Sequence, residues 1–439
     1  ILVGNPDANR IIAVSTAAVF DDKSLPHTFW GMDNRNIDSG FQGHLYTGPD
    51  DILVVRVPGH DPAIIGMVST AIKENCEIWK SLTGIDILPA TGNLILASDY
   101  PCPSVSRLPE QFTWHVGSLL DAAVARFRKG EEAFLAFVPD NQLAKALGIS
   151  HDDNPGLVEL AQNTSLLMDK NAAMQVLQAH GVNCAATYPV NEDSDPATVI
   201  GKIPASGHFV FKPSGGAAGI GVFGNTKEGV SLDAIREHLD TLRHLGQLPG
   251  RYQIQEFLPG KSFGATAFLY QDGTFDLFEI HQQIINHAGR FIGGRWTPAI
   301  QAAQFKSTNT LFTQMTAISQ PRISGLICLD VIKKKIIEVN PRLTASAPIT
   351  HILRRQGDIS RHLGSQFSIK QIDLNTAVQI PFAAIQNGNL RGVIERMWNE
   401  YQVLVLPQGI NPFGASRFVF INDSVDGKAQ LAFIRQTWH

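Results

Sequence analysis

The sequence lacks several features, and each absence excludes a class of protein. Only four of the 439 residues are cysteine, and none forms a CxxC pair, which argues against a disulfide framework and against a zinc cluster. No run of about 18–20 apolar residues occurs, so a membrane-spanning helix is excluded. Charged residues make up 17% with a net charge of −4, too few for disorder and without the basic excess that favours nucleic acid. The cytoplasm is the expected location.

Hydrophobic residues make up 44% of the sequence, enough to build large cores. At roughly 100–200 residues per domain, the length predicts two or three domains. The apolar runs 1–3, 52–55 and 134–138 are predicted to be buried strands, and the stretches 64–73 and 116–129 are predicted to be helices. This alternation predicts an open parallel sheet in the first third of the chain.

The apolar stretch 11–20 follows Arg10 and has to be distinguished from a secretory signal. A signal would continue into a small-residue cleavage site, whereas two aspartates and a lysine follow here. We therefore expect a buried strand. The chain begins at Ile1 rather than Met, which is typical of a sequence that lacks its first residues.

The middle of the chain has a different pattern. Apolar residues at helical spacing over 169–180, followed by a glycine, predict a helix with a defined end. A strand is predicted at 209–212 and a helix at 232–245, with Ser231 as its N-cap. Strands are expected to dominate after this helix, and the last stretch, 346–439, mixes helix and strand.

The first candidate site is a glycine-rich loop. Lys212 ends a predicted strand, and four of the next nine residues are glycine. Glycine permits positive φ and close backbone approach, so such a loop can direct N–H groups at phosphate oxygens while the lysine adds charge. A mobile hairpin loop with a surface lysine explains the isolated segment equally well. The P-loop pattern is absent. GxGxxG at 219–224 is rejected as a dinucleotide fingerprint because Val222 and Phe223 within it are expected to be extended and the next helix begins only near Leu232.

The second candidate is QEFLPG at 255–260, where a strand ends against a Pro-Gly turn. The backbone around Phe257 and Leu258 is then available to pair with a flat heterocycle. An ordinary strand and turn with a surface glutamate is the alternative interpretation, and the segment alone favours it.

The strongest candidate is LDVIKKKIIEVNPR at 329–342, which predicts a tight hairpin. Pairing centred on Lys334 puts Asp330 opposite Glu338, and Asn340 points to the same face. Two carboxylates and an amide oxygen form an oxygen-only site of the kind that suits Mg²⁺. The alternative is a solvated edge hairpin, but polar residues within apolar strands favour the metal.

Taken in order, these segments resemble the ATP-grasp superfamily of carboxylate–amine ligases, over about residues 165–346. The eight-residue spacing from Asp330 to Glu338 is similar to that of bacterial glutathione synthetases. The segment 340–344 is similar to the corresponding ending in amine–glutamate ligases. The resemblance implies an α/β fold with a Rossmann-like pre-ATP-grasp domain over 1–162, a two-lobed α+β ATP-grasp domain over 163–345 with a lid subdomain at about 170–256, and a C-terminal α+β extension over 346–439 that completes the substrate site.

The resemblance also implies residue roles. The nucleotide-binding residues would be Lys170, Lys212, Ser214, Gly215, Gly216, Gly219, Gly221, Gln255, Glu256, Phe257, Leu258 and Ser262. Two Mg²⁺ ions, replaceable by Mn²⁺, would be held by Asp330, Glu338 and Asn340, with Glu338 bridging. Arg342 would stabilise the transferring phosphoryl group, with Arg295 and Lys212 as further catalytic groups. Ser262 stands where many members have an acidic residue for the ribose.

The function implied is an ATP-dependent ligase that joins a carboxylate (an amino acid or small peptide) to an amine, as in peptide bond formation. The reaction would pass through an acyl phosphate and release ADP and phosphate. A phosphotransferase that makes no C–N bond and a non-catalytic nucleotide-binding protein remain alternatives. The implied partners are small molecules, with neither nucleic acid nor membrane, and a homodimer is expected. His281 and His287 have no metal-ligand spacing and are predicted to be polar loop residues, while GxSxG and HExxH motifs are absent.

Overall fold

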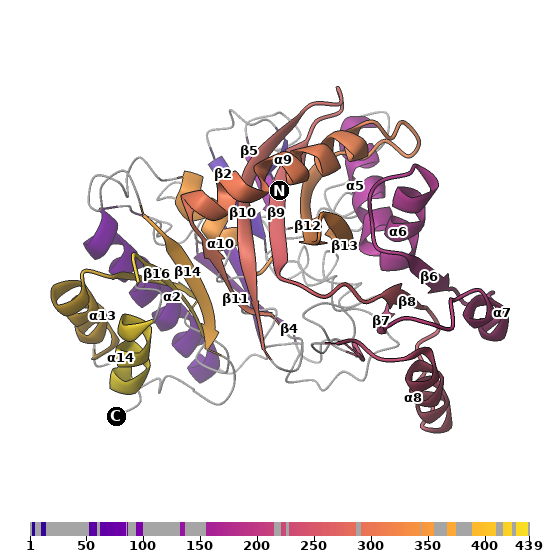
Figure 1. Cartoon of the computed structure of the whole chain (residues 1–439). Coiled ribbons are helices and arrows are strands. Elements are labelled where there is room, and N and C mark those ends of the chain that lie inside the picture. The colour runs from indigo at the N-terminus through magenta and orange to yellow at the C-terminus, as the bar shows by residue number, and fades with distance from the viewer. Residues whose placement is uncertain are drawn as a thin grey trace.

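The computed structural model describes residues 2–4, 10–14, 52–58, 62–84, 86, 94–99, 132–136, 155–214, 221–224, 228–286, 291–342, 344–354, 367–374, 389–409, 416–423 and 427–437. Within them the fold is mixed α/β with three sheets (Figure 1). None of the helices in these ranges is long and apolar enough to cross a membrane.

The N-terminal sheet has five strands in the order β1-β5-β2-β3-β4. Its strands are β1 (Leu2–Gly4), β2 (Arg10–Val14), β3 (Ile52–Pro58), β4 (Leu94–Asp99) and β5 (Glu132–Ala136). β2 to β5 pair in parallel, and only the edge strand β1 is antiparallel. The predicted open parallel sheet is confirmed, and the helix predicted at 64–73 is the longer α2 (Pro62–Thr83). The helix predicted at 116–129 and most of the stretch 11–20 lie outside the described residues.

The central sheet has eight strands in the order β13-β12-β9-β10-β11-β14-β16-β15, and every neighbouring pair is antiparallel. Its strands are β9 (Ser262–Leu269), β10 (Phe275–Ile285), β11 (Phe291–Trp296), β12 (Gly325–Ile332), β13 (Lys335–Asn340), β14 (Ile369–Leu374), β15 (Leu404–Gly409) and β16 (Ser416–Ile421). The C-terminal strands therefore continue the same sheet through the pairing of β11 with β14.

A small sheet projects from the side of the molecule opposite to the C-terminal helices (Figure 1). It has the order β6-β8-β7 and carries two helices with a core of its own. Its elements are β6 (Thr187–Val190), β7 (Phe209–Pro213), β8 (Tyr252–Glu256), α7 (Pro196–Gly201) and α8 (Leu232–His244). Ser231 caps α8 as predicted, because its Oγ accepts a hydrogen bond from Ala234 N at 3.2 Å.

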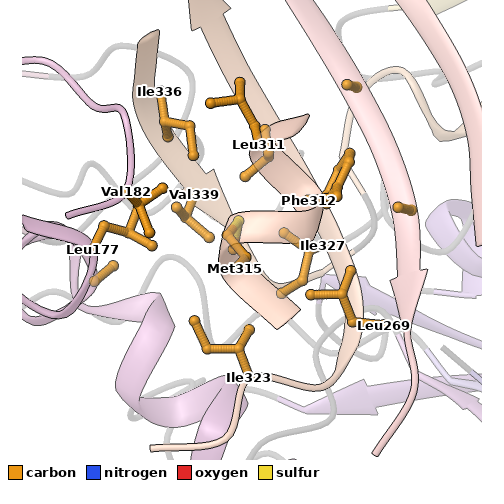
Figure 2. Packing of buried hydrophobic residues seen from close by; sticks show 14 of the residues in the cluster. Leu177, Val182, Leu269, Leu311, Phe312, Met315, Ile323, Ile327, Ile336 and Val339 are labelled. Atoms are coloured by element: carbon orange, nitrogen blue, oxygen red, sulfur yellow. The ribbon is translucent and has the colours of Figure 1, made fainter. Parts of the chain in front are cut away.

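The main core lies on one face of the central sheet, where three helices cover it. These are α5 (Pro155–Met168), α6 (Lys170–Ala179) and α9 (Pro298–Thr316). Figure 2 shows Leu311, Phe312 and Met315 of α9 packed against Ile327 of β12. We call this side of the sheet the core face and the opposite side, which carries Asp330, the polar face.

The last layer contains elements from the N-terminal and the C-terminal regions of the chain. α10 (Ala347–Arg354) contacts β10, whereas α13 (Asn389–Tyr401) and α14 (Lys428–Thr437) pack on β15 and β16 in a second core. α2 also packs here, and Trp79 Nε1 donates a hydrogen bond to Pro407 O at 2.6 Å. A helix from the N-terminal region thus helps to cover the C-terminal strands.

Candidate active site

The β12–β13 hairpin positions two carboxylates. Its turn residues, Lys333 and Lys334, have φ of 49° and 65°, the left-handed conformation that a two-residue type I′ turn requires. The turn pairs Ile332 with Lys335 and Val331 with Ile336, and a register shift after Val331 then brings Asp330 opposite Glu338. The predicted pairing of the two carboxylates is confirmed, although the turn is not centred on Lys334, and we call Asp330 and Glu338 the carboxylate pair. Both are partly exposed, so a ligand can reach them.

The small sheet contacts this hairpin at a β-bulge. The register shifts between Asp330 and Val331, which leaves Ile337 without a partner opposite. The Ile337 carbonyl instead accepts hydrogen bonds from Lys212 Nζ at 3.3 Å and Gln255 Nε2 at 3.1 Å. Lys212 Nζ also donates to Gln255 Oε1 at 2.8 Å. β7 and β8 thus place a lysine beside the hairpin through buried side chains.

Three cations from separate elements converge on the carboxylate pair. Lys170 begins α6, Lys212 lies near the end of β7, and Arg342 follows β13. Lys170 Nζ lies 3.5 Å from Glu338 Oε1. All three side chains are buried, and the charges of Lys212 and Arg342 also act on Glu338. We call Lys170, Lys212 and Arg342 the three cations.

The charges around the carboxylate pair shift the pKa values of its two members in opposite directions. Removal from water raises the pKa of Asp330, and the charge of Glu338 raises it further. Removal from water acts on Glu338 in the same direction, but the three cations outweigh it and leave the pKa of Glu338 below its ordinary value. Burial lowers the pKa of Lys212, and Glu338 compensates only in part. Two carboxylates at one place resist full ionisation until a cation joins them.

The donor atoms fit a hard divalent cation. Asn340 lies two residues after Glu338 and so shares its face, and Asn340 Oδ1 accepts a hydrogen bond from Arg342 Nη2 at 2.9 Å. The carboxylate pair and Asn340 offer only oxygen ligands, as Mg²⁺ prefers. In the described ranges, no group of three His, Cys, Asp or Glu residues could hold a metal unaided. The site therefore suits an ion that takes its remaining ligands from water and phosphate.

Two further residues of the polar face form a relay to Asp330. Gln283 Nε2 donates to Asp330 Oδ1 at 2.7 Å, and Ser262 Oγ donates to Gln283 Oε1 at 2.5 Å. The hydroxyl of Ser262 is thereby directed into the site rather than outward. Sequence reasoning missed Gln283, whose place depends on the pairing of β10 with β9.

The prediction that His281 is a loop residue is wrong. His281 lies within β10, is 1% exposed, and contacts Glu279 through Nδ1 and Oε2 at 2.8 Å. Thr266 Oγ1 donates to Glu279 Oε1 at 2.7 Å. The signal available in the sequence was the alternation Glu279, His281, Gln283, which puts three polar side chains on one face of a strand. His287 lies outside the described residues.

The hinge after β8 keeps one amide available. Glu256 N and Phe257 N donate to Ala186 O and His208 O, both at 2.8 Å. No hydrogen bond in the described part of the chain uses the N–H of Leu258. This leaves Leu258 as the hinge group able to pair with a heterocycle.

The side chain of Glu256 has two partners. Its Oε2 accepts from Ala186 N at 3.3 Å and from Lys335 Nζ at 3.1 Å. The carboxylate therefore connects the hinge to the segment before β6 and to β13.

The start of the glycine-rich loop is tied to α6. Ser214 Oγ donates to Asp169 Oδ1 at 2.7 Å, and the Ser214 carbonyl accepts from Lys170 N at 3.2 Å. Gly221, at the end of the loop, has φ of 70°. The remaining predicted loop residues, Gly215, Gly216 and Gly219, lie outside the described residues.

The structure does not bring Arg295 to this cluster. Arg295 pairs with Gln282 on β10, one residue from His281. Because side chains alternate along a strand, Arg295 faces the core side while His281 and Asp330 share the polar face. The sequence-based assignment of Arg295 as a catalytic group is corrected on this geometry, since the Gly-Gly before it gave no information on register.

The sequence model of the ATP-grasp domain matches residues 167–346, which include the small sheet, β8 to β13 and all of the convergent side chains. This part of the chain is an ATP-grasp domain. The match covers less than half of the chain, and no curated protein sequence matches the chain.

Solved structures agree with this fold at low identity. Biotin carboxylase from Campylobacter jejuni, in a βγ-ATP complex, is 10% identical with a TM-score of 0.53, over 97% of this chain and 90% of that one. N5-carboxyaminoimidazole ribonucleotide synthetase from Thermus thermophilus is 12% identical with a TM-score of 0.50, over 97% and 98%. The ADP complex of another such synthetase is 11% identical with a TM-score of 0.50, over 100% and 98%. At these identities the likeness concerns the fold.

Proposed function

We propose that this protein is an ATP-dependent ligase that activates a carboxylate as an acyl phosphate and transfers the acyl group to an amine, releasing ADP and phosphate. The observation that carries the proposal is the convergence of the three cations on the carboxylate pair. Phosphoryl transfer depends on positioning and charge neutralisation more than on covalent help from the protein, and this arrangement supplies both.

The nucleotide would lie between the small sheet and the polar face. Leu258 would pair through its free N–H with the adenine edge, and the adenine would stack near the turn that leads into β9. Lys170 and Lys212 would hold the phosphates, with Ser214 and the glycine-rich loop closing over them. Ser262 would contact the ribose, with Gln283 holding its hydroxyl in place.

The metal would be held by the carboxylate pair and Asn340. When bound, Mg²⁺ neutralises the charge on the β- and γ-phosphates. Arg342, held by Asn340, would stabilise the phosphoryl group as its oxygens gain negative charge. Arg295 has no role in this proposal.

The reaction would proceed in two steps. A carboxylate oxygen attacks the γ-phosphorus, the bond from that phosphorus to the β–γ bridging oxygen breaks, and ADP leaves. The amine nitrogen then attacks the acyl carbon, the C–O bond to phosphate breaks, and the nitrogen loses a proton. The three cations stay in place throughout, so no reorganisation of charge by the protein is needed.

The test is phosphate release from ATP and Mg²⁺ with a panel of amino acids, short peptides and bicarbonate, with hydroxylamine as the trapping amine. Bicarbonate belongs in the panel because two of the similar structures are a carboxylase and a carboxyaminoimidazole synthetase. Acid-dependent ADP and hydroxamate are expected, and both should disappear in Glu338→Gln. Glu237→Gln on the exposed side of α8 is the matched control and should leave both unchanged.

Other products would overturn the proposal in distinguishable ways. AMP would exclude the acyl phosphate. A phosphorylated product that forms without an amine and yields no hydroxamate would identify a phosphotransferase. Nucleotide binding without turnover on any acid would favour a binding protein.

A further inference from the structure

The Glu279–His281 pair on β10 has a buried nitrogen that no described residue satisfies. His281 Nδ1 lies 2.8 Å from Glu279 Oε2, and we assign Nδ1 as the donor of this hydrogen bond because a carboxylate oxygen accepts. The other ring nitrogen, Nε2, is buried and has no hydrogen-bond partner among the described residues. An unsatisfied buried polar atom is destabilising, so a ligand that hydrogen-bonds to Nε2 would remove that cost.

Two glycines define where this nitrogen points. A Cβ on Gly264 would lie 2.1 Å from His281 Cε1 and 2.5 Å from Nε2, whereas a Cβ on Gly294 would lie 3.0 Å from Cδ2. The Cε1–Nε2 edge of the ring therefore lies above Gly264, which pairs with Asp330 on the next strand. This edge therefore lies on the polar face, over the residue that separates His281 from Asp330 across β9.

The surroundings select an anion as the partner. The three cations outnumber the carboxylate pair, and a bound metal would add further positive charge. Burial lowers the pKa of His281, but the charge of Glu279 and its hydrogen bond to the ring raise it above its ordinary value. With Nδ1 bonded to Glu279, Nε2 lies on the same face as the cations, where an acidic oxygen is the matching partner.

We propose that Glu279 holds His281 so that Nε2 binds an anionic oxygen of the reacting molecules, either a nucleotide phosphate oxygen or the carboxylate that accepts the phosphoryl group. This rests on the proposed function only in placing such molecules on the polar face. His281 is thereby assigned a binding role, and Glu279 acts through it as a positioning residue.

The first experiment reads His281 directly in the intact protein. Histidine labelled with ¹³C at Cε1 is observed by NMR, and the His281 signal is assigned by its loss in His281→Asn. The probes are MgADP, the Mg²⁺ complex of β,γ-methylene ATP, and then acetate or bicarbonate added to the MgADP complex. A shift with a nucleotide indicates a phosphate oxygen, and a shift only with acetate or bicarbonate indicates the carboxylate. Absence of any shift would overturn the proposal.

The second experiment separates contact from indirect effects by measuring the affinity for the probe that shifts the signal. His281→Asn retains a group near Nδ1 but does not reach the place of Nε2, so binding should weaken by about tenfold, as for loss of a charged hydrogen bond. His281→Gln reaches that place and should remain within about threefold of wild type. Gly264→Ala should weaken binding because it displaces the ring, whereas Gly392→Ala on α13, with nothing within 4 Å, is the matched control.

If the NMR signal shifts in the wild-type protein while His281→Asn binds the probe as tightly as wild type, the Glu279–His281 pair is only a structural contact, and the proposal is overturned. Its failure is distinguishable from failure of the proposed function. If MgADP binds and hydroxamate forms while His281 gives no response, only the inference fails. If no nucleotide binds, the proposed function fails, and acetate or bicarbonate added to the protein alone still reports on His281.

Discussion

On β12, Leu329 is completely buried in the core, whereas Asp330, the next residue, lies on the polar face and is partly exposed. The same division runs across the neighbouring strands: Ala265 and Ile280 face the core, and His281 and Asp330 face the site. One set of strands thus serves two purposes, because alternate residues of a strand point to opposite faces.

The two faces of the sheet differ in which groups contact their side chains. The core face is completed within the protein, by the apolar side chains of α5, α6 and α9. The polar face retains a carboxylate pair with opposed pKa shifts and an unpartnered ring nitrogen among the described residues. Its polar groups fit a metal and anionic ligands better than they fit one another.

The substitution with the largest expected effect on turnover changes only the polar face. Asp330→Asn retains an acceptor for Gln283 but removes a metal-binding charge, so turnover should fall by about 10²–10³-fold. The free energy of unfolding without metal should stay the same or rise, since the repulsion from Glu338 is relieved. Steady-state kinetics and denaturant titration measure the two quantities, and Asp233→Asn on α8 is the exposed control. Unchanged turnover would remove Asp330 from the site.

Substitution of the preceding residue, Leu329, changes only the core face. Leu329→Ala creates a cavity at a completely buried position and should lower the free energy of unfolding by about 2–5 kcal/mol. Turnover of the folded fraction should remain within about tenfold of wild type, because the side chain points away from the site. Leu245→Ala, at a position 61% exposed, provides the matched control in the same denaturant titration. A stability loss as small as that of the control would contradict the division of faces.

The pH dependence of metal binding sharpens the comparison. Removal from water and the charge of Glu338 raise the pKa of Asp330 to about 7, so the folded protein without metal binds this proton more tightly than the unfolded chain. The stability of the metal-free protein therefore falls as the pH rises from about 4 to 7, and Mg²⁺ competes with the proton. Glu338, with its lowered pKa, stays ionised throughout.

Mg²⁺ should accordingly bind roughly fivefold to tenfold more tightly at pH 8 than at pH 6, because about a tenth of a group is ionised one unit below its pKa. The Mg²⁺-dependent rise in melting temperature at the two pH values measures this, with EDTA as the metal-free reference. Equal shifts would show that Asp330 does not contribute a titrating ligand.

The smallest effect concerns Arg295. Because its side chain leaves the sheet on the side opposite to Asp330, Arg295→Gln should change turnover by less than about threefold. Arg342→Gln, which removes a buried cation of the site, should cost about 10²-fold. Parallel kinetic measurements on the two variants test the strand register at β11. Equal losses would mean that the register of Arg295 is wrong.

Several elements could be predicted because their signals are local. The caps of α6 and α8 depend on side chains within three residues of the backbone that they satisfy. The tight lysine turn that starts the hairpin is likewise local. These features need no information from distant parts of the chain.

Other elements could not be predicted. No helix was predicted at α9, which lies in a stretch where strands were expected to dominate. Its apolar residues are diluted by threonine and glutamine, and only Leu311, Phe312 and Met315 among its large apolar side chains are buried. Its helical state is stabilised by packing on β10. The faces of His281 and Arg295 likewise depend on pairing between β9, β10 and β11, which single-strand patterns do not encode.

The sequence by itself indicated the type of chemistry that we propose. The oxygen-bearing side chains, the lysine before a glycine-rich loop and the Asp330-to-Glu338 spacing are properties of short segments. The tertiary structure decided which side chains meet. Lys170 and Lys212 come from a helix and a strand more than a hundred residues before the hairpin. Lys170 contacts Glu338, and Lys212 donates a hydrogen bond to the Ile337 carbonyl. Such convergence arises from packing and pairing between elements far apart in the chain, where no local pattern records the partner.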